Sequence, residues 1–423
     1  MRDGGRMAAA IEVLGDIAAR HRPAHLALKA WGEGARYAGA KDRAFVSGLV
    51  LDVLRRRRSL GWRMSEESDR ARVLGALRFL WDWPPERLEA AAAEDHGPGP
   101  LGETERARLM EPASLAEAPA PVRGDYPDWL EPAMVRAFGE ARAAEGEALA
   151  ARAPVDLRVN TLKTDVAHVL KVLAPFGPAA LDFPPSAVRI PPPAASERAA
   201  PVEASPAFQK GWFEVQDAAS QVAAAAAGDI PGRQVLDFCA GGGGKTLALA
   251  ALMGNTGQLY AYDADARRLT DTVRRGARAG VRNLQVRSPI DPDALSGLEG
   301  RMDLVFVDAP CTGSGTWRRR PDAKWRLTPQ QLERRIAEQD AALAAAARFV
   351  KPGGRLVYVT CSLFAEENED RVAALTASRP DFAPAPAELE GAQRWRTAEG
   401  FLRLTPRTAG SDGFFVATLR RSS

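Results

Sequence analysis

Four consecutive glycines, Gly241 to Gly244, follow a short apolar run in the stretch VLDFCAGGGGKT and constrain the fold more than any other feature of the chain. A strand that ends in glycines can turn sharply and bring its backbone close to a ligand with no side chain in the way. The stretch therefore predicts a strand, a ligand-binding turn and a helix. The alternative is a glycine turn that only packs a helix closely.

Two well-known glycine loops do not fit. A phosphate-binding loop needs a glycine five residues before its Gly-Lys-Thr, where this chain has Cys239, and a dinucleotide loop needs a third glycine where it has Thr246. A second apolar run, QLYAY, ends in Asp263, and an acid there commonly binds ribose hydroxyls. These features favour a nucleoside ligand without a long phosphate chain, of which S-adenosylmethionine is the common example.

Apolar runs and helical patterns alternate through the C-terminal half of the chain. This alternation predicts an α/β fold with a doubly wound, mostly parallel sheet. The predicted strands lie in the stretches QVLDFCA, QLYAYDA, LQVRS, DLVFVDAP, GRLVYVTCS and GFFVATLRR.

The preceding half of the chain is predicted to form separate parts. Residues 1–95 have apolar positions at helical spacing and predict an all-α domain. Residues 96–125 are rich in Pro, Gly, Ala and Glu and predict a linker, and residues 126–205 predict a small α+β subdomain before the α/β domain at 206–423. Arg55 to Arg58 could bind phosphates or simply face water, and the sequence leaves both open.

The composition excludes several classes of protein. The 423 residues contain only three cysteines, too few for a disulfide framework or a zinc site. The net charge of +3 is too small to indicate nucleic-acid binding by itself. The first residues do not resemble a signal peptide, and no run of about 18 apolar residues occurs. We therefore expect a cytoplasmic protein that does not bind membranes.

Two cysteines follow predicted strands of the sheet. Cys311 follows Asp308-Ala309-Pro310, and Cys361 follows Thr360. Because ligands bind beyond the carboxyl ends of such strands, both thiols could reach the cleft of the glycine loop. Each cysteine alone is more simply explained as a small buried apolar residue. Together with Asp308 and a methyl donor, the pair indicates chemistry.

Thiol chemistry suits methylation of a pyrimidine. Carbon 5 of the ring is a poor nucleophile until a thiolate adds at carbon 6. Carbon 5 can then take a methyl group, after which its proton and the enzyme sulfur must leave. Asp308 could protonate or hydrogen-bond the ring nitrogen during the addition. The base must lie outside any helical stack for this reaction.

The stretches DFCAGGGGKT, VDAPCTGSG and YVTCS, with FEVQDAASQ before them and SDGFFVA after them, resemble the RNA 5-methylcytosine methyltransferases of the RsmB (Fmu/Sun) type over roughly residues 126 to 420. The resemblance implies a Rossmann-like class I methyltransferase domain, with Cys361 as the nucleophile, Cys311 assisting product release and Asp308 contacting base and cofactor. It also implies a cofactor site that Lys245 closes and in which Asp263 holds the ribose. The implied cofactor residues are Cys239, Ala240, Gly241, Gly242, Gly243, Gly244, Lys245, Asp263 and Asp308.

RNA-binding residues are implied in three places. Arg158, Asn160 and Lys163 match the family's RVN-LK motif, in a small domain that contacts RNA. The helical residues 1–95 look like a NusB-type RNA-binding module, which implies 16S ribosomal RNA as the substrate. Cations interleaved with Trp317 and Trp325 would suit single-stranded RNA, with a solvated loop as the alternative; those cations are Arg318, Arg319 and Lys324. We expect a monomer without a metal ion.

The sequence departs from the family in the cofactor site. Gly241 and Gly242 replace the usual alanine and proline, which should make the empty loop more flexible. Ser288-Pro289 stands where an acid usually faces the adenine, with Asp291 nearby. These changes suggest a rival function, a ribosome-assembly factor that binds RNA with a degenerate methyltransferase pocket.

Overall fold

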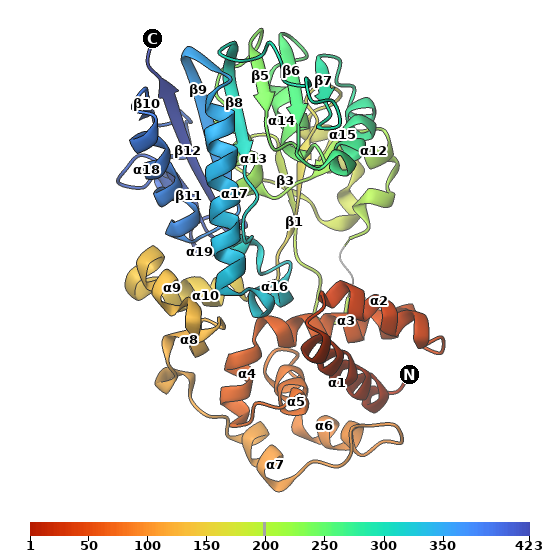
Figure 1. Ribbon diagram of the computed structural model, residues 1–423. Coiled ribbons are helices and arrows are strands. Elements are labelled where there is room, and N and C mark those ends of the chain that lie inside the picture. Colours follow the sequence, from red (N-terminus) through yellow and green to blue (C-terminus); the bar gives the residue numbers. More distant parts are fainter. Residues whose placement is uncertain (198–199) are drawn as a thin grey trace. The chain divides into compact units, whose positions relative to one another are not determined.

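The computed structural model describes residues 1–197 and 200–423, which form two compact units (Figure 1). Unit 1 consists of residues 1–152, the described part of 192–199 and the segment Trp317–Leu327. Unit 2 consists of the described remainder, Ala153–Pro191, 200–316 and Thr328–Ser423.

Unit 1 is helical, as the apolar spacing of its sequence predicted. Its core is formed mainly by α1, α3 and α5, which contribute Met7, Leu49 and Leu74, each fully buried. The helices are α1 (Asp3–Arg20), α2 (Ala24–Gly34), α3 (Ala40–Arg55), α4 (Arg57–Met64), α5 (Asp69–Phe79), α6 (Pro85–Ala92), α7 (Glu103–Met110), α8 (Ala120–Arg123), α9 (Glu131–Phe138), α10 (Arg142–Leu149) and α16 (Pro321–Arg326).

The predicted linker at 96–125 is a packed part of unit 1. It contains α7 and α8, and its Leu101 and Leu109 are buried in the same core as α1 and α5. Composition misled the prediction because prolines also occur in the first turn of helices, where no backbone N–H is needed, and Pro121 occupies that place in α8.

Unit 2 contains two sheets. The smaller is antiparallel, with strand order β2-β3-β1-β4, and the larger has the order β10-β12-β9-β8-β5-β6-β7 with β11 paired to β12. The strands of the smaller sheet are β1 (Val155–Val159), β2 (Ala179–Ala180), β3 (Ala187–Ile190) and β4 (Phe213–Val215). Those of the larger sheet are β5 (Gln234–Asp237), β6 (Gln258–Tyr262), β7 (Leu284–Arg287), β8 (Met302–Asp308), β9 (Val350–Thr360), β10 (Phe382–Pro384), β11 (Leu402–Leu404) and β12 (Phe414–Arg421).

The larger sheet is the predicted doubly wound, mostly parallel sheet. Strands β7, β6, β5, β8 and β9 are parallel neighbours, whereas β12 runs antiparallel beside β9. Along β8, Val305 and Val307 lie in one core and Leu304 and Phe306 in the other, so both faces of the strand are buried.

Helices cover both faces of this sheet. One face packs against α17 and α18, and the other against α13 and α14 (Figure 1). The helices of unit 2 are α11 (Val166–Val172), α12 (Pro206–Gln209), α13 (Ala218–Ala225), α14 (Gly244–Leu252), α15 (Ala266–Ala279), α17 (Pro329–Ala347), α18 (Glu369–Ser378) and α19 (Pro406–Ala409). Short 3-10 helices across the chain are η1 (Leu115–Glu117), η2 (Asp128–Leu130), η3 (Gly139–Ala141), η4 (Ala174–Phe176), η5 (Val202–Ala204), η6 (Ser314–Thr316), η7 (Ala365–Glu367) and η8 (Gln393–Trp395).

None of the helices within residues 1–197 and 200–423 has the length and apolarity that a membrane span requires.

Candidate active site

The glycine loop connects β5 to α14 at the carboxyl edge of the sheet. Gly241 and Gly243 have φ angles of 53° and 83°, which favour glycine. A Cβ atom at Gly243 would lie 2.9 Å from Oγ1 of Thr272, whereas one at Gly244 would meet no atom within 4 Å. The loop is therefore packed against α15 on one side and leaves open space at the N-terminus of α14 on the other.

Asp263 holds the glycine loop in place. Its Oδ2 accepts a hydrogen bond from the Gly241 N–H at 2.8 Å, and its Oδ1 accepts one from the Asp265 N–H at 2.8 Å. Thr272 donates to the Gly241 carbonyl oxygen from α15, at 2.9 Å. Asp263 is thus a loop anchor in this structure, and its contact with a ribose stays a prediction.

Lys245 joins the loop to the strand that leads to Cys311. Its Nζ lies 2.7 Å from Oδ2 of Asp308, at the end of β8. The Lys245 side chain is largely buried, so this pair orients the carboxylate without strong competition from water. The lysine is engaged with a carboxylate of the chain itself, unlike the lysine that a phosphate-binding loop offers to its ligand.

Three carboxylates surround the loop and make its surroundings acidic. Burial, together with the charges of Asp237, Asp263 and Asp308, raises the pKa of the Cys239 thiol, so this cysteine stays protonated and is unsuited to nucleophilic attack. Oδ1 of Asp237 has no hydrogen-bond partner among the described residues. An acidic, glycine-lined site suits a positively charged sulfonium nucleoside better than a phosphate, and these residues fit S-adenosylmethionine.

The predicted substitute for the missing adenine-facing acid lies on the surface after β7. Asp291 is exposed, and its Oδ1 accepts a hydrogen bond from the Asp293 N–H at 3.0 Å. Its role toward an adenine stays a prediction.

Asp237 should make the stability of the protein depend on pH. Burial raises its pKa from 3.8 to about 7, opposed by a hydrogen bond from Thr246 and by Lys245, and reinforced by Asp308 and Asp263. Since the folded state holds this proton more tightly than the unfolded state, the free energy of unfolding should fall as pH rises from about 4 to 7, by at most about 1.4 kcal/mol per pH unit. In Asp237→Asn the amide oxygen can still accept the hydrogen bond from Thr246, but the side chain no longer titrates. The free energy of unfolding of this variant should therefore lose this dependence on pH.

The measurement is the free energy of unfolding by urea at pH 5 and at pH 7.5, in the absence of cofactor. Asp271→Asn, at an exposed position on α15, is the control and should keep the slope of the unmodified protein. Equal slopes in the protein and in Asp237→Asn would contradict the prediction.

The two strand-end cysteines lie side by side. Sγ of Cys311 is 3.3 Å from Sγ of Cys361, because β8 and β9 are parallel neighbours that end at the same edge of the sheet. The pKa of the Cys311 thiol is raised well above its ordinary value, first by its hydrogen bond with Cys361 and then by burial. Cys311 therefore keeps its proton and can donate it in a hydrogen bond to the sulfur of Cys361.

Backbone contacts explain the small residues around the cysteines. The Gly315 N–H donates to the Cys361 carbonyl oxygen at 2.9 Å, and the Gly413 N–H donates to the Gly315 carbonyl oxygen at 2.8 Å. A Cβ atom at Gly315 would lie only 2.1 Å from the Gly413 carbonyl oxygen. The TGSG and SDG motifs thus allow two backbones to meet beside the thiols.

The sequence did not single out Glu367, Thr312, Ser362 and Gln339, although their side chains form one hydrogen-bonded cluster beside the cysteines. The only signal was that Thr312 and Ser362 each follow a cysteine.

The residues of the RVN-LK motif bind other parts of unit 2. Arg158 is 5% exposed and donates to Oε1 of Gln216 at 2.7 Å, and burial lowers the pKa of its guanidinium to about 10. Asn160 is 3% exposed and donates to the carbonyl oxygens of Gly211 and Ala279. This burial does not favour direct contact of Arg158 and Asn160 with RNA, which stays a prediction.

Lys163 is exposed, but its Nζ is also hydrogen-bonded within the chain. It donates to the carbonyl oxygens of Arg278 at 2.7 Å and Lys210 at 3.0 Å. Arg278 and Ala279 end α15, where carbonyl groups lack partners inside the helix. Lys163 and Asn160 therefore cap α15, and Lys163 is the exposed residue of the three.

Two of the three cations predicted to bind RNA after Cys311 are buried in unit 1. Lys324 is 1% exposed and donates to the Arg55 carbonyl oxygen at 2.8 Å, and Arg318 is 3% exposed. Burial lowers the pKa of Lys324 to about 7. Because Arg55 ends α3, the lysine satisfies a carbonyl that lacks an intrahelical partner. Burial thus disfavours direct RNA contact by Arg318 and Lys324, which stays a prediction, and half-buried Arg319 is the more accessible candidate.

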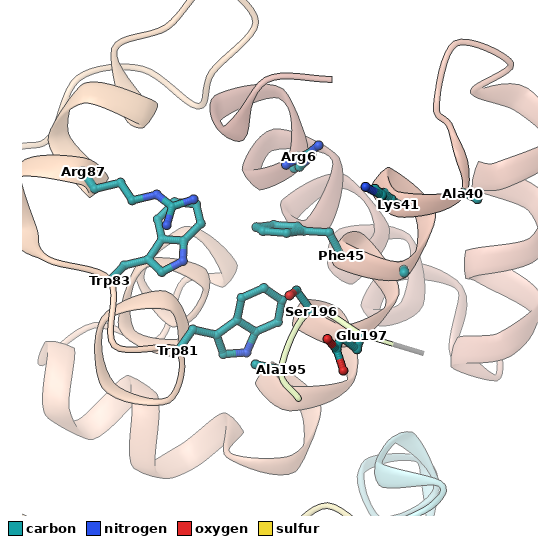
Figure 2. Close-up of a pocket in the computed structure, with 11 residues that line it drawn as sticks. Arg6, Ala40, Lys41, Phe45, Trp81, Trp83, Arg87, Ala195, Ser196 and Glu197 are labelled. Carbon is teal, nitrogen blue, oxygen red and sulfur yellow. The ribbon is translucent and has the colours of Figure 1, made fainter. Parts of the chain in front are cut away.

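Unit 1 has a cavity of about 600 Å³ lined by aromatic and charged residues (Figure 2). Phe45 packs edge-on against Trp81 at 4.8 Å, and Arg87 lies over Trp83. The arginines of the cavity are paired with acids, Arg87 with Asp3 and Arg6 with Asp42. The residues that line this cavity include no cysteine or histidine.

Within the described ranges 1–197 and 200–423, no group of three or more His, Cys, Asp or Glu side chains is placed to hold a metal ion.

Comparisons with known proteins agree with this geometry. A family model described as 16S rRNA methyltransferase RsmB/F matches residues 229–420, and a RsmF/B-like ferredoxin-like domain matches residues 126–195. The probable ribosomal RNA small subunit methyltransferase B of Synechocystis sp. is 30% identical over 426 residues, which cover 90% of this chain and 92% of that protein.

Two further similarities cover less of the chain. The ribosomal RNA small subunit methyltransferase F of Escherichia coli is 34% identical over 63% of this chain, and the chain spans only 57% of that relative. The crystal structure of a methyltransferase homolog protein from Pyrococcus horikoshii is 29% identical, with a TM-score of 0.60, over 73% of this chain and 99% of that one.

The predicted family, fold and cofactor are confirmed by these similarities. The chain belongs to the RsmB/F family of 16S rRNA methyltransferases, whose methyl donor is S-adenosylmethionine.

Proposed function

We propose that this protein methylates carbon 5 of a cytosine in 16S ribosomal RNA through a covalent bond between Cys361 and carbon 6 of the base. The observation that carries the proposal is the pair of thiols, 3.3 Å apart, at the carboxyl edge of β8 and β9. A methyl transfer to an already nucleophilic atom would require neither thiol.

Attack begins at Cys361. Its thiolate adds to carbon 6, and the electron pair of the carbon 5–carbon 6 double bond moves through the ring as nitrogen 3 gains a proton. Asp308 delivers this proton after taking it from the Lys245 ammonium, whose Nζ lies 2.7 Å from its Oδ2. Carbon 5 of the adduct is then electron-rich, and S-adenosylmethionine supplies the methyl group that it takes.

Release reverses the addition. The proton on carbon 5 leaves to a water molecule, and the electrons of its bond re-form the carbon 5–carbon 6 double bond. The carbon 6–sulfur bond breaks, its electron pair returns to the sulfur of Cys361, and nitrogen 3 gives its proton back to Asp308. The thiol of Cys311 donates a hydrogen bond to that sulfur as negative charge develops on it, and the raised pKa of Cys311 keeps the donor proton in place.

The candidates for RNA contact in this proposal are the exposed Lys163 in unit 2 and the half-buried Arg319 in unit 1. The resemblance of the helical residues 1–95 to a NusB-type RNA-binding module supports a role for unit 1 in binding ribosomal RNA. The proposed steps use no metal ion and only groups of one chain, so we expect an active monomer.

The test is methyl transfer from isotope-labelled S-adenosylmethionine to 16S ribosomal RNA that lacks modifications, followed by bisulfite mapping of the labelled RNA. We expect label at carbon 5 of one or a few cytosines. Label on another base or atom would refute the proposal. The rival function, an RNA-binding assembly factor with a degenerate pocket, requires that calorimetry show no binding of S-adenosylmethionine.

A further inference from the structure

Glu367 is a fully buried carboxylate between β9 and α18 that the proposed chemistry does not use. Its Oε1 accepts hydrogen bonds from the Thr312 N–H at 2.8 Å and from Nε2 of Gln339 at 3.0 Å. Its Oε2 accepts from the hydroxyls of Thr312 and Ser362. A buried carboxylate is stable only with such donors, and these four balance its charge.

The donors tie Glu367 to both cysteines. Thr312 follows Cys311 directly and Ser362 follows Cys361 directly. The Glu367 carboxylate therefore accepts hydrogen bonds from the residue that follows each cysteine. Other links between the two loops, such as the hydrogen bond between the Ser314 and Ser362 hydroxyls at 3.1 Å, join neutral groups. Glu367 adds a charge-assisted link, which is stronger than a neutral one.

We propose that Glu367 is a positioning residue that sets the distance between the sulfurs of Cys311 and Cys361. This inference rests on the proposed function, because the distance matters for attack and release at carbon 6. Misplacement of reacting groups by about 1 Å can lower a rate by about 100-fold, so a carboxylate that fixes both loops can govern the rate without touching the RNA.

The negative charge of Glu367 has a second effect. It adds to the hydrogen bond with Cys361 and to burial in raising the pKa of Cys311. The carboxylate thus supports the protonated form of Cys311, the form that donates to the neighbouring sulfur.

Three substitutions separate position from charge. Glu367→Gln keeps the length of the side chain, and its amide can still accept from the Thr312 N–H and donate to the two hydroxyls. Glu367→Asp keeps the charge but is one methylene too short, and Glu367→Ala removes every contact. Glu369→Gln, two residues away in a pair with Arg403, is the matched control.

We expect kcat to fall about 100-fold in Glu367→Ala and Glu367→Asp, with KM for RNA and the dissociation constant of S-adenosylmethionine within about twofold of the unmodified protein. Glu367→Gln should keep kcat within about tenfold and move the high-pH limb of the rate profile to lower pH, because loss of the negative charge lets Cys311 lose its proton more readily. Glu369→Gln should change neither kcat nor the profile.

A second measurement needs no RNA. Mild oxidation with diamide should join Cys311 and Cys361 in a disulfide, detected by peptide mass spectrometry, at least tenfold more slowly in Glu367→Asp than in the unmodified protein or in Glu369→Gln. Unchanged disulfide formation with unchanged kcat in Glu367→Asp would overturn the positioning role. If carbon 5 methylation fails in the unmodified protein, the proposed function is refuted, while the disulfide rate still decides whether Glu367 sets the distance.

Discussion

Replacing Cys361 with alanine should abolish methyl transfer to 16S ribosomal RNA, with a fall in kcat of at least about 10⁴-fold, comparable to the loss of a nucleophile in other covalent enzymes. Alanine cannot add to carbon 6, and carbon 5 then stays too electron-poor to take a methyl group. The binding of S-adenosylmethionine should change little, because the glycine loop and the Lys245–Asp308 pair do not depend on this thiol.

The assignment of the nucleophile to Cys361 is decided by comparing three variants. Single-turnover transfer of labelled methyl groups should be undetectable in Cys361→Ala, and Cys239→Ala should lose far less, because its thiol packs against an apolar core. Affinities for RNA and cofactor, measured for each variant, should match those of the unmodified protein and so show that the variant is folded. Retained transfer in Cys361→Ala together with its loss in Cys311→Ala would mean that the two adjacent thiols have the opposite roles.

The sequence predicted the larger sheet and the cysteine pair for a clear physical reason. Strands buried on both faces are continuous apolar runs, as in LVFV before Asp308 and LVYV before Thr360, and the ends of parallel neighbours meet at one edge. Two thiols at such strand ends therefore lie close together, whatever conformation the residues between the two strands adopt. Their separation of 3.3 Å could not be predicted, because it depends on the backbones of Gly315 and Gly413 and on Glu367.

Four residues that were predicted to bind RNA are buried for one common reason. Arg158, Asn160, Arg318 and Lys324 were chosen from charge and motif, yet burial depends on which segments pack together. Lys324 and Asn160 satisfy carbonyls at the ends of α3 and α15, and no local pattern shows that a distant helix end needs a donor. Glu367 was missed for the reverse reason, since EENED looks like the solvated, acidic start of a helix.

Replacing Cys311 with alanine should trap the protein on its RNA. The covalent bond forms through Cys361, which this variant keeps, but the departing sulfur loses the hydrogen-bond donor at 3.3 Å. A hydrogen bond to a charged group contributes about 1.5–3 kcal/mol, so release should slow about 10- to 150-fold and the adduct should accumulate.

Denaturing gels should show a protein band retarded by RNA that disappears after ribonuclease treatment. The band should be weak in the unmodified protein and absent from the double variant Cys311→Ala/Cys361→Ala, because without Cys361 no adduct forms. Slow turnover of Cys311→Ala without any adduct would instead place Cys311 before the covalent step and remove its role in release.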